Sequence, residues 1–523
     1  MFWLIISVLA VVTLWFLLDR PLHHWEKLGA KQTKPWIILG DSWPTVLGLS
    51  NFPDMLQTVY NLYPEARYTG MYQCYTPALL LKDPELIKLI TVKDFDHFTD
   101  RSTFLDPEVD PVVGRNLLSL KGQRWRDMRA TLSGSFTSSK MKFIFGLINA
   151  TTQRFVEHLK NRQGDVIELE LKDALTRFAN DVIATSAFGL TVDSLSQPEN
   201  EFYLSGKKMS DLTSLRVLVK FFGYLVFPQL FRTLKIGLLD SSATRFLQKV
   251  LTETIRVREE EGIVRPDMIN ILLEAKKGAK DEEPVLVDTG FATVEESSPG
   301  RSKSHPAITN DDITSQAFIF FFAGFNSSST AMCFAAYELA RHPEVQCRLR
   351  DEIHQVQRHC EGKITYEALL GMKYLDMVVS EVLRKWPPIF AMDRVCTKPY
   401  VIEAVKSDEE PLRLRVGDAV ILPFQAIHRD PINYPDPDKF DPERFSDENK
   451  RKIRPYTYLP FGVGPRNCLG SRFALLEVKM LLFNLLAAFE LVPTARSVIP
   501  LRLAKRSPNV VIEGGLWFGL KRL

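Results

Sequence analysis

One cysteine near the C-terminal end of the chain lies in a loop whose composition suits metal binding. The loop reads Pro460-Phe461-Gly462-Val463-Gly464-Pro465-Arg466-Asn467-Cys468-Leu469-Gly470, and a largely apolar run over 473–489 follows it. Glycine lets the backbone approach a flat ligand closely, and arginine supplies a fixed cation for a carboxylate. A thiolate at such a turn, just before a helix, can hold a metal from one side. The alternative is a buried structural cysteine in a glycine-rich turn.

Three further groups of residues could take part in chemistry or support it. Glu381 and Arg384 are three apart and share one helical face, although any surface helix can show such a pair. Trp125 and Arg129 are four apart and could present an indole and a guanidinium to a carboxylate. Taken alone, that segment is better explained as a solvated basic helix with one core tryptophan. Arg444 lies downstream, in the Pro-Glu-Arg-Phe sequence of a loop rich in proline and aspartate.

A long apolar helix is expected at the centre of the molecule. The Thr-Asn-Asp-Asp sequence at 309–312 predicts a capped start, and the helical run continues to about Arg341. Its centre, 317–325, is apolar on all sides, so we expect the helix to be buried. Asn326 and Ser327 follow directly on this centre.

The first residues are expected to anchor the chain in a membrane. Residues 2–18 are apolar apart from one serine and one threonine and carry no charge, which is near the short end of a membrane-spanning helix. The alternative is a cleaved signal peptide, but no positive segment precedes the run and no small-residue cleavage site follows it. Lysines that follow the run place the body of the protein in the cytosol. Four tryptophans fit interfacial positions: Trp3, Trp15, Trp25 and Trp36.

Composition limits the possible functions and the domain organisation. The 523 residues carry a formal net charge of +3, so no strong attraction to nucleic acid is implied. The six cysteines are sparse, as in a reducing compartment, and no cysteine–histidine cluster offers a zinc site. The polar stretch 276–306 is interpreted as a flexible loop rather than a domain boundary. We therefore expect an anchor at 2–18, a linker at 19–50 and a single domain at 51–523.

A second strongly apolar stretch lies at 212–239. Four basic residues interrupt it, so it is not expected to form a second membrane span. An apolar surface with basic edges, next to an anchor, suggests contact with one leaflet of a bilayer. A pair of ordinary core helices joined by a proline turn explains the same pattern equally well.

Taken together, these motifs resemble those of the cytochromes P450, over nearly the whole chain after residue 35. The pattern Phe-x-x-Gly-x-Arg-x-Cys-x-Gly resembles the haem-binding loop of that family, here Phe461, Gly464, Arg466, Cys468 and Gly470. The resemblance implies that Cys468 is the axial iron ligand. It implies that the haem carboxylates are held by Arg394, Trp125, Arg129 and Arg466. It also implies a buried ionic cluster that braces the segment before the cysteine, formed by Glu381, Arg384 and Arg444.

The family fold is mainly α-helical with small β-sheets, and the resemblance implies this fold here. It has the outline of a triangular prism, with the haem between the central long helix and the helix after the cysteine loop. The details look like an animal microsomal enzyme, similar to the insect and vertebrate xenobiotic-metabolising branch. That likeness implies a monooxygenase that inserts one oxygen atom from O2 into lipophilic substrates. The implied cofactors are haem b, O2, and NADPH acting through a reductase. The implied partners are that NADPH–cytochrome P450 reductase, docked near 124–129, cytochrome b5 and the endoplasmic reticulum membrane, with the catalytic domain in the cytosol.

The central helix departs from the family pattern at the oxygen side of the site. The usual Ala/Gly-Gly-x-Asp/Glu-Thr-Thr/Ser motif puts Asn326 at the acid position and Ser327 at the threonine position. In the family this acid–alcohol pair relays protons during oxygen activation. Ser327 keeps a hydroxyl, but Asn326 cannot titrate. Either the relay tolerates the change, or oxygen activation is altered or slowed. In the second case the chain could be a haem-thiolate protein that sequesters ligands, or an enzyme that rearranges peroxides.

Overall fold

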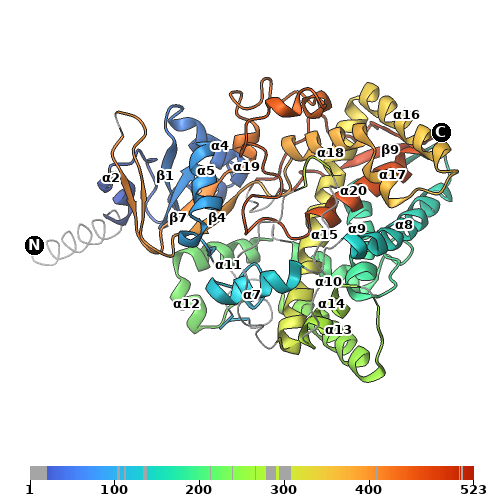
Figure 1. The fold of residues 1–523 in the computed structure, drawn as a ribbon, viewed down its shortest axis with the longest axis horizontal. Coiled ribbons are helices and arrows are strands. Elements are labelled where there is room, and N and C mark those ends of the chain that lie inside the picture. Colours follow the sequence, from blue (N-terminus) through green and yellow to red (C-terminus); the bar gives the residue numbers. More distant parts are fainter. Residues whose placement is uncertain are drawn as a thin grey trace, which may run out of the picture.

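The computed structural model describes residues 20–102, 107–110, 114–133, 138–211, 214–237, 239–265, 267–277, 290–293, 308–407, 409–505, 507 and 510–523. The predicted anchor at 2–18 lies outside these residues. Within the described residues, helices dominate, and the strands form small sheets of four, three and two strands. The expectation of a mainly α-helical chain with small β-sheets is confirmed, and Figure 1 shows the arrangement.

The elements described have the following bounds. The α-helices are α2 His24–Lys27, α3 Trp43–Val46, α4 Phe52–Leu62, α5 Pro84–Lys88, α7 Gly122–Ser133, α8 Ser138–Lys160, α9 Leu171–Phe188, α10 Glu201–Ser210, α11 Leu215–Val226, α12 Pro228–Thr233, α13 Ser241–Glu261, α14 Met268–Lys276, α15 Asn310–Arg341, α16 Pro343–His359, α17 Tyr366–Leu370, α18 Lys373–Lys385, α19 Phe424–His428 and α20 Ser471–Leu486. The strands are β1 Tyr68–Gln73, β2 Thr76–Leu81, β3 Val166–Glu170, β4 Met392–Val395, β5 Tyr400–Ile402, β6 Leu412–Leu414, β7 Ala419–Leu422, β8 Phe489–Val492 and β9 Trp517–Arg522. A short 3-10 turn, η5, covers Pro442–Phe445.

The four-stranded sheet has the order β1-β2-β7-β4 and forms one end of the molecule in Figure 1. β1 and β2 pair antiparallel with Tyr68 opposite Leu81, and β2 runs parallel to β7. β4, which carries Arg394, pairs antiparallel with β7. Leu79 and Leu80 at the middle of β2 are fully buried, so this sheet has its own apolar core.

The segment 20–50, expected to be a linker, packs against this sheet instead. Trp25 is fully buried, and its indole N–H donates to the carbonyl oxygen of Met71 over 3.3 Å. A Cβ at Gly70 would overlap the Trp25 side chain, so the strand needs glycine where the indole crosses it. The interfacial position expected for Trp25 is therefore wrong, because this residue belongs to the core. Trp36 is half exposed and stacks on Trp43 at 4.5 Å.

The central helix α15 has the bounds that its sequence predicts. Thr309 caps it and forms a capping box with Asp312, because the side chain of each residue accepts a hydrogen bond from the backbone N–H of the other. The helix ends at Arg341, and Pro343 starts α16 directly afterwards. Among the described residues, α15 alone is long and apolar enough to cross a membrane. Most of its apolar part is buried within the protein, as in a core helix.

Candidate active site

The cysteine loop is held in one conformation by its own backbone. Gly462 and Gly464 both have a φ of +74°, and a Cβ at Gly464 would overlap the carbonyl oxygen of Thr91. The Cys468 N–H donates to the carbonyl oxygen of Phe461 over 2.8 Å and closes the loop. Helix α20 begins three residues later, at Ser471. The loop therefore presents the cysteine just before a helix N-terminus, where a thiolate is stabilised.

The Cys468 side chain is exposed although the loop around it is buried. Arg466, Asn467 and Leu469 are all less than a tenth exposed. A Cβ at Gly470 would meet nothing within 4 Å, so space is open beside the cysteine. Desolvation by the surrounding protein raises the pKa of the Cys468 thiol, while the Gly470 N–H and the charge of Arg129 lower it. The sulfur thus borders an open space deep in the protein, and bound iron would take the place of its proton.

Helix α15 has an opening of the same kind at its centre. Phe321 and Phe325 are buried, but Ala323 between them is exposed, so an open space lies beside the helix there. The expectation that this centre is buried on all sides is therefore wrong at Ala323. Ser327, one turn further on, donates its hydroxyl to the Ala323 carbonyl oxygen over 2.7 Å. Helix α15 packs against α20, the helix that follows the cysteine.

Three arginines gather near the cysteine loop: Arg394 and Arg466 are buried, and Arg101 is partly buried. Arg466 donates to the carbonyl oxygens of Thr99 and Leu120 over 2.8 and 2.7 Å. Its guanidinium lies 4.0 Å from the centre of the Trp125 ring, an attractive cation–π distance. Burial, helped by the charge of Arg101, lowers the pKa of Arg466 to about 8 and that of Arg394 to about 9.

This arginine group has more positive than negative charge. Asp100 and Asp393 are the two acids that raise the pKa of Arg466, against three guanidinium groups. The Nε atoms of Arg101 and Arg394 are buried and have no hydrogen-bond partner. Buried donors without partners cost free energy, so the group fits a ligand that carries two carboxylates. Arg101 was missed by sequence reasoning, because it follows Thr99-Asp100 without any recognisable motif.

Helix α7 fastens the cysteine loop from the other side. Arg129 donates from Nη1 to the Asn467 carbonyl oxygen over 3.0 Å and from Nη2 to Asn467 Oδ1 over 2.5 Å. Trp125 and Arg129 are both buried, so their face of α7 belongs to the core, in contrast to the solvated helix suggested by that segment alone. Asn467 was not singled out in the sequence, since its partner lies 338 residues away in the chain.

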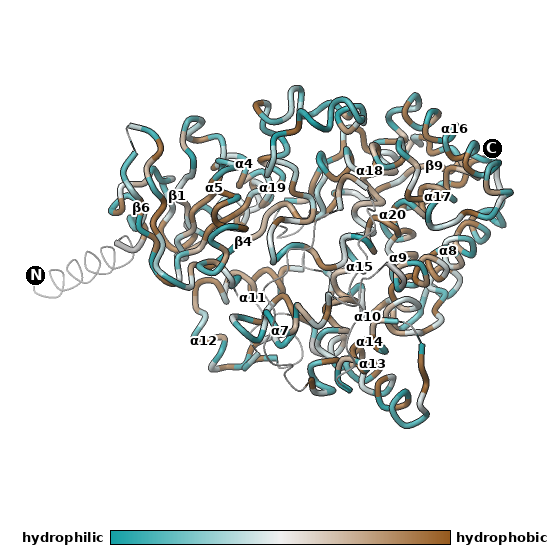
Figure 2. Tube along the Cα trace, viewed as in Figure 1, coloured by the Kyte–Doolittle hydropathy of each residue, from teal (hydrophilic) through white to brown (hydrophobic). Residues whose placement is uncertain are grey.

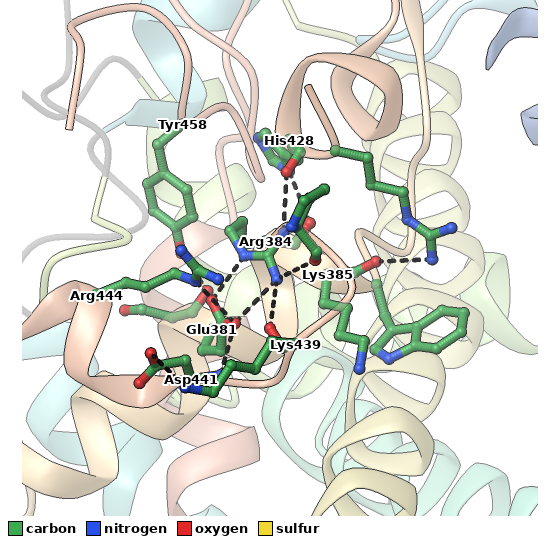
Figure 3. Close-up of polar contacts among 12 residues, drawn as sticks. Glu381, Arg384, Lys385, His428, Lys439, Asp441, Arg444 and Tyr458 are labelled. Atoms are coloured by element: carbon green, nitrogen blue, oxygen red, sulfur yellow. Dashed lines mark hydrogen bonds and ion pairs between the residues drawn. The ribbon is translucent and has the colours of Figure 1, made fainter. Parts of the chain in front are cut away.

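The predicted pair of Glu381 and Arg384 forms a fully buried ion pair on α18. Arg384 donates from Nε and Nη2 to the two carboxylate oxygens over 2.7 and 2.9 Å. Its remaining N–H groups reach the carbonyl oxygens of His428 and Pro437 over 2.9 and 2.8 Å. Arg444 Nε lies 3.6 Å from the Glu381 carboxylate, so all three predicted residues come together, as Figure 3 shows. Burial raises the pKa of Glu381, and Arg384 opposes that effect.

His428 links this ionic cluster to the approach of the cysteine loop. Its Nε2 accepts from the Leu459 N–H over 2.7 Å, so the proton lies on Nδ1, which donates to the Arg384 carbonyl oxygen over 3.1 Å. Burial lowers the pKa of His428 to about 3, which keeps the ring neutral. No sequence pattern predicted this role.

Asn326, at the acid position of the family motif, is bound by a lysine. Lys172 on α9 donates to Asn326 Oδ1 over 3.1 Å, to Ser329 Oγ over 3.0 Å and to Thr330 Oγ1 over 3.0 Å. Burial lowers the pKa of Lys172, while the charge of Glu170 raises it. Lys172 was missed, because nothing in its own segment indicates that α9 crosses α15 at this point.

A second missed residue is Glu477 on α20. It is almost fully buried, and desolvation raises its pKa to about 8, while the Ser328 hydroxyl of α15 lowers it. A carboxyl group in this environment is mostly protonated at pH 7. Glu477 is therefore a neutral acid beside the serine that follows Ser327.

Replacing Glu477 by glutamine should change how folding stability depends on pH. The folded chain holds a proton on Glu477 between pH 4.5 and about 8 that the unfolded chain releases, so wild-type stability falls as pH rises through this range. Glu477→Gln removes this loss, and its unfolding free energy should gain about 2 kcal/mol over the wild type between pH 6 and pH 8. Urea unfolding followed by tryptophan fluorescence measures it. The exposed Glu448→Gln is the control, and parallel curves for Glu477→Gln and the wild type would contradict the shift.

Replacing Arg384 by alanine should remove folded protein or bound haem rather than only slow turnover. The change leaves the Glu381 carboxylate buried without its partner, which costs about 3–5 kcal/mol. Urea unfolding and haem absorbance per protein measure the effect. Arg413→Ala, on the exposed position of β6, is the matched control. Normal haem content with slower turnover in Arg384→Ala would speak against a structural role.

Comparison with known proteins agrees with this geometry. The family model described as cytochrome P450 matches residues 42–512. "Cytochrome P450 9e2" of Blattella germanica is 45% identical, covering 92% of this chain and 91% of that protein. "Probable cytochrome P450 9f2" of Drosophila melanogaster is 41% identical over 94% and 93%, and "Cytochrome P450 6k1" of Blattella germanica is 37% identical over 94% and 92%. The chain therefore belongs to the cytochrome P450 family of haem-thiolate monooxygenases.

Proposed function

We propose that Cys468 is the axial iron ligand of a monooxygenase that acts on lipophilic substrates. One observation carries the proposal: an accessible sulfhydryl lies deep in the protein, beside three arginines, two of them buried, whose charge exceeds that of the nearby acids. A haem has a flat apolar ring and two carboxylates, so it fits both the open space and the unpaired cations. When bound, haem-thiolate iron supplies the oxygen chemistry, and the protein supplies orientation and proton supply.

The surrounding residues would then divide the work of holding this group. Arg394 and Arg466, together with Arg101, would bind the haem carboxylates, and Trp125 would back the Arg466 guanidinium. Arg129 would act through Asn467, which it holds by two hydrogen bonds. Phe461, Gly464 and Gly470 would shape the loop around the sulfur.

Ser327 and Asn326, both on α15, would handle protons on the side of the site that this helix forms. The Ser327 hydroxyl donates to the Ala323 carbonyl at the exposed position of α15, where it could hold a water molecule. Asn326 offers an amide that Lys172 already binds, so it can orient a neighbour but not titrate. This arrangement favours a relay built on Ser327 with a proton source other than residue 326.

The electrons would come from NADPH through a reductase, with cytochrome b5 as a second donor. Docking near α7 is supported by the exposed side chains of Lys121, just before the helix, and of Arg124, which stays 61% exposed although it pairs with Asp312 over 3.3 Å. Arg126 is a poorer contact, because it is 22% exposed and pairs with Asp96 over 2.6 Å. A basic surface of this kind steers an acidic partner at low ionic strength.

We further propose that the chain is held at the endoplasmic reticulum membrane by residues 2–18 and by the surface of α11 and α12. Five large apolar side chains are exposed there: Leu215, Val219, Phe227, Leu230 and Leu234. Phe52 of α4 lies 6.4 Å from both Phe221 and Phe222, which fixes α11 to the N-terminal part of the body. Figure 2 shows the hydrophobic stretch along α11. This exposure favours bilayer contact over the alternative of a core helix pair.

The activity is tested by reconstitution with reductase and NADPH, measuring product per NADPH consumed with lipophilic compounds that shift the haem spectrum. Product formation supports the monooxygenase. Asn326 favours a second candidate, ligand sequestration, for which bound compound should give no product. Turnover of a hydroperoxide without NADPH would instead indicate a rearranging enzyme.

Asn326→Asp, whose carboxylate would face the Lys172 ammonium, should raise the yield per NADPH if residue 326 limits the relay. An unchanged yield would show that residue 326 does not limit the relay.

The membrane surface is tested with a chain that lacks residues 2–18. Sedimentation with phospholipid vesicles should still recover a bound fraction, because the α11 surface remains. Val219→Asp should lower that fraction, since a charge at this position disfavours contact with acyl chains. Val264→Asp, at a valine after α13 that is 79% exposed against 62% for Val219, is the control and should have no effect. Equal losses in both variants would contradict the assignment.

A further inference from the structure

Residues 290–293 lie within the stretch 276–306 that was expected to be a flexible loop, yet they pack against the body of the protein. The Thr293 N–H donates to the Gly290 carbonyl oxygen over 2.9 Å and closes a four-residue turn. Ala292 in this turn is almost fully buried. The flexible-loop interpretation is therefore corrected for these four residues.

The Phe291 ring packs in a cluster of aromatic side chains on the side of the molecule that carries Cys468. Its centre lies 5.2 Å from that of Phe445, at an interplanar angle of 61°, and 5.4 Å from that of Tyr458, at 35°. Phe445 and Tyr458 lie 5.0 Å from each other, so the three rings form one cluster. Each such pair adds stabilisation beyond the apolar area that it buries.

The backbone of the turn contacts an ion pair between Asp376, which is partly buried, and Lys479. The Phe291 N–H donates to Asp376 Oδ2 of α18 over 2.9 Å, while Lys479 Nζ of α20 lies 2.8 Å from the other oxygen. Lys479 is fully buried. Gly290 has a φ of +127°, and a Cβ there would overlap both Asp376 Oδ1 and Lys479 Nζ. The site thus selects a glycine followed by an aromatic residue, from both the shape and the hydrogen bond.

The Tyr458 ring, which Phe291 contacts, is connected to the segment just before the cysteine loop. The Tyr458 hydroxyl donates to the Ser380 carbonyl oxygen over 2.9 Å, and its ring stacks on His428 at 5.6 Å. His428 in turn accepts from the Leu459 N–H. Tyr458 and Leu459 directly precede the loop that carries Cys468. Loss of the contacts that hold Tyr458 should therefore loosen the segment that positions the Cys468 sulfur.

We propose that Gly290–Thr293 is an intramolecular docking segment, bound at a site formed by α18, η5 and α20, that helps to hold the cysteine loop in place. The segment that binds is a turn in which a glycine is followed by an aromatic residue. The site recognises it through the rings of Phe445 and Tyr458 and the carboxylate of Asp376. The docking itself stands on the contacts above. Its consequence for the cysteine rests on the proposed function, in which Cys468 is the iron ligand.

Amide hydrogen exchange in the full-length holoprotein tests the docking. The wild type should protect the Phe291 N–H, and Phe291→Ala and Gly290→Ala should speed exchange at this position by about tenfold or more after correction for intrinsic rates. Phe291→Tyr keeps the ring and should stay near the wild type. Gly146→Ala on α8 is the matched glycine control, because a Cβ there meets nothing within 4 Å. An unprotected Phe291 N–H in the wild type would overturn the docking.

The effect on the cysteine is read from the spectrum of the reduced carbon monoxide complex, which differs between thiolate-bound and thiolate-free haem. On mild heating, Phe291→Ala and Gly290→Ala should lose the thiolate-type spectrum about two- to tenfold faster than the wild type, the range that one aromatic pair represents. Phe291→Tyr should restore the wild-type rate. Faster exchange with an unchanged rate of thiolate loss would overturn the link to Cys468. A thiolate-type spectrum absent from every protein, the wild type included, would overturn the proposed function, while exchange would still decide the docking.

Discussion

The buried ion pair between Glu381 and Arg384 is the interaction on which the thiolate side of the structure depends. A buried charge pair contributes little net stability by itself, but it becomes costly when one partner is removed. Here the arginine also binds the carbonyl oxygens of His428 and Pro437, so one guanidinium joins α18 to the end of α19 and to the loop that contains Pro437. His428 in turn accepts a hydrogen bond from the N–H of Leu459, just before the cysteine loop. Order at the sulfur therefore depends on charge pairing on a helix remote from it in the chain.

The arginine group near the cysteine follows the opposite rule. In the α18 cluster, each donor of Arg384 has an acceptor in the protein. Near Cys468, by contrast, Arg101 and Arg394 keep buried Nε atoms without partners, and burial lowers the pKa of Arg394 and Arg466. A folded protein tolerates such unmatched charge where a ligand supplies the missing anion. Arg444 Nε in the α18 cluster is also buried without a hydrogen-bond partner, so what distinguishes the group near Cys468 is its excess of guanidinium over carboxylate charge, which a cofactor with two carboxylates would complete.

Local signals in the sequence predicted the elements well. The capping box at Thr309 and the proline at 343 define both ends of α15. Sequence spacing also brought Glu381 and Arg384 together, because they share one helical turn. Contacts between distant segments left no such trace. The partners of Asn467 and Lys172 lie 338 and 154 residues away, and Trp25 is buried by a strand that only the folded sheet provides.

The same limit explains the residue that departs from the family motif. In isolation, asparagine at 326 reads as the loss of an acid, but the structure puts the Lys172 ammonium 3.1 Å from its Oδ1. The charge of Lys172 is already opposed by Glu170, whose carboxylate also accepts from the N–H groups of Asp173 and Leu516. Electrostatics therefore does not require an acid at 326. Two titratable groups lie next to the hydroxyls of α15: Lys172 donates to Ser329, and Glu477, whose pKa burial raises to about 8, borders Ser328. Asparagine at 326 therefore leaves α15 with titratable neighbours on α9 and α20, although the residue itself cannot exchange a proton.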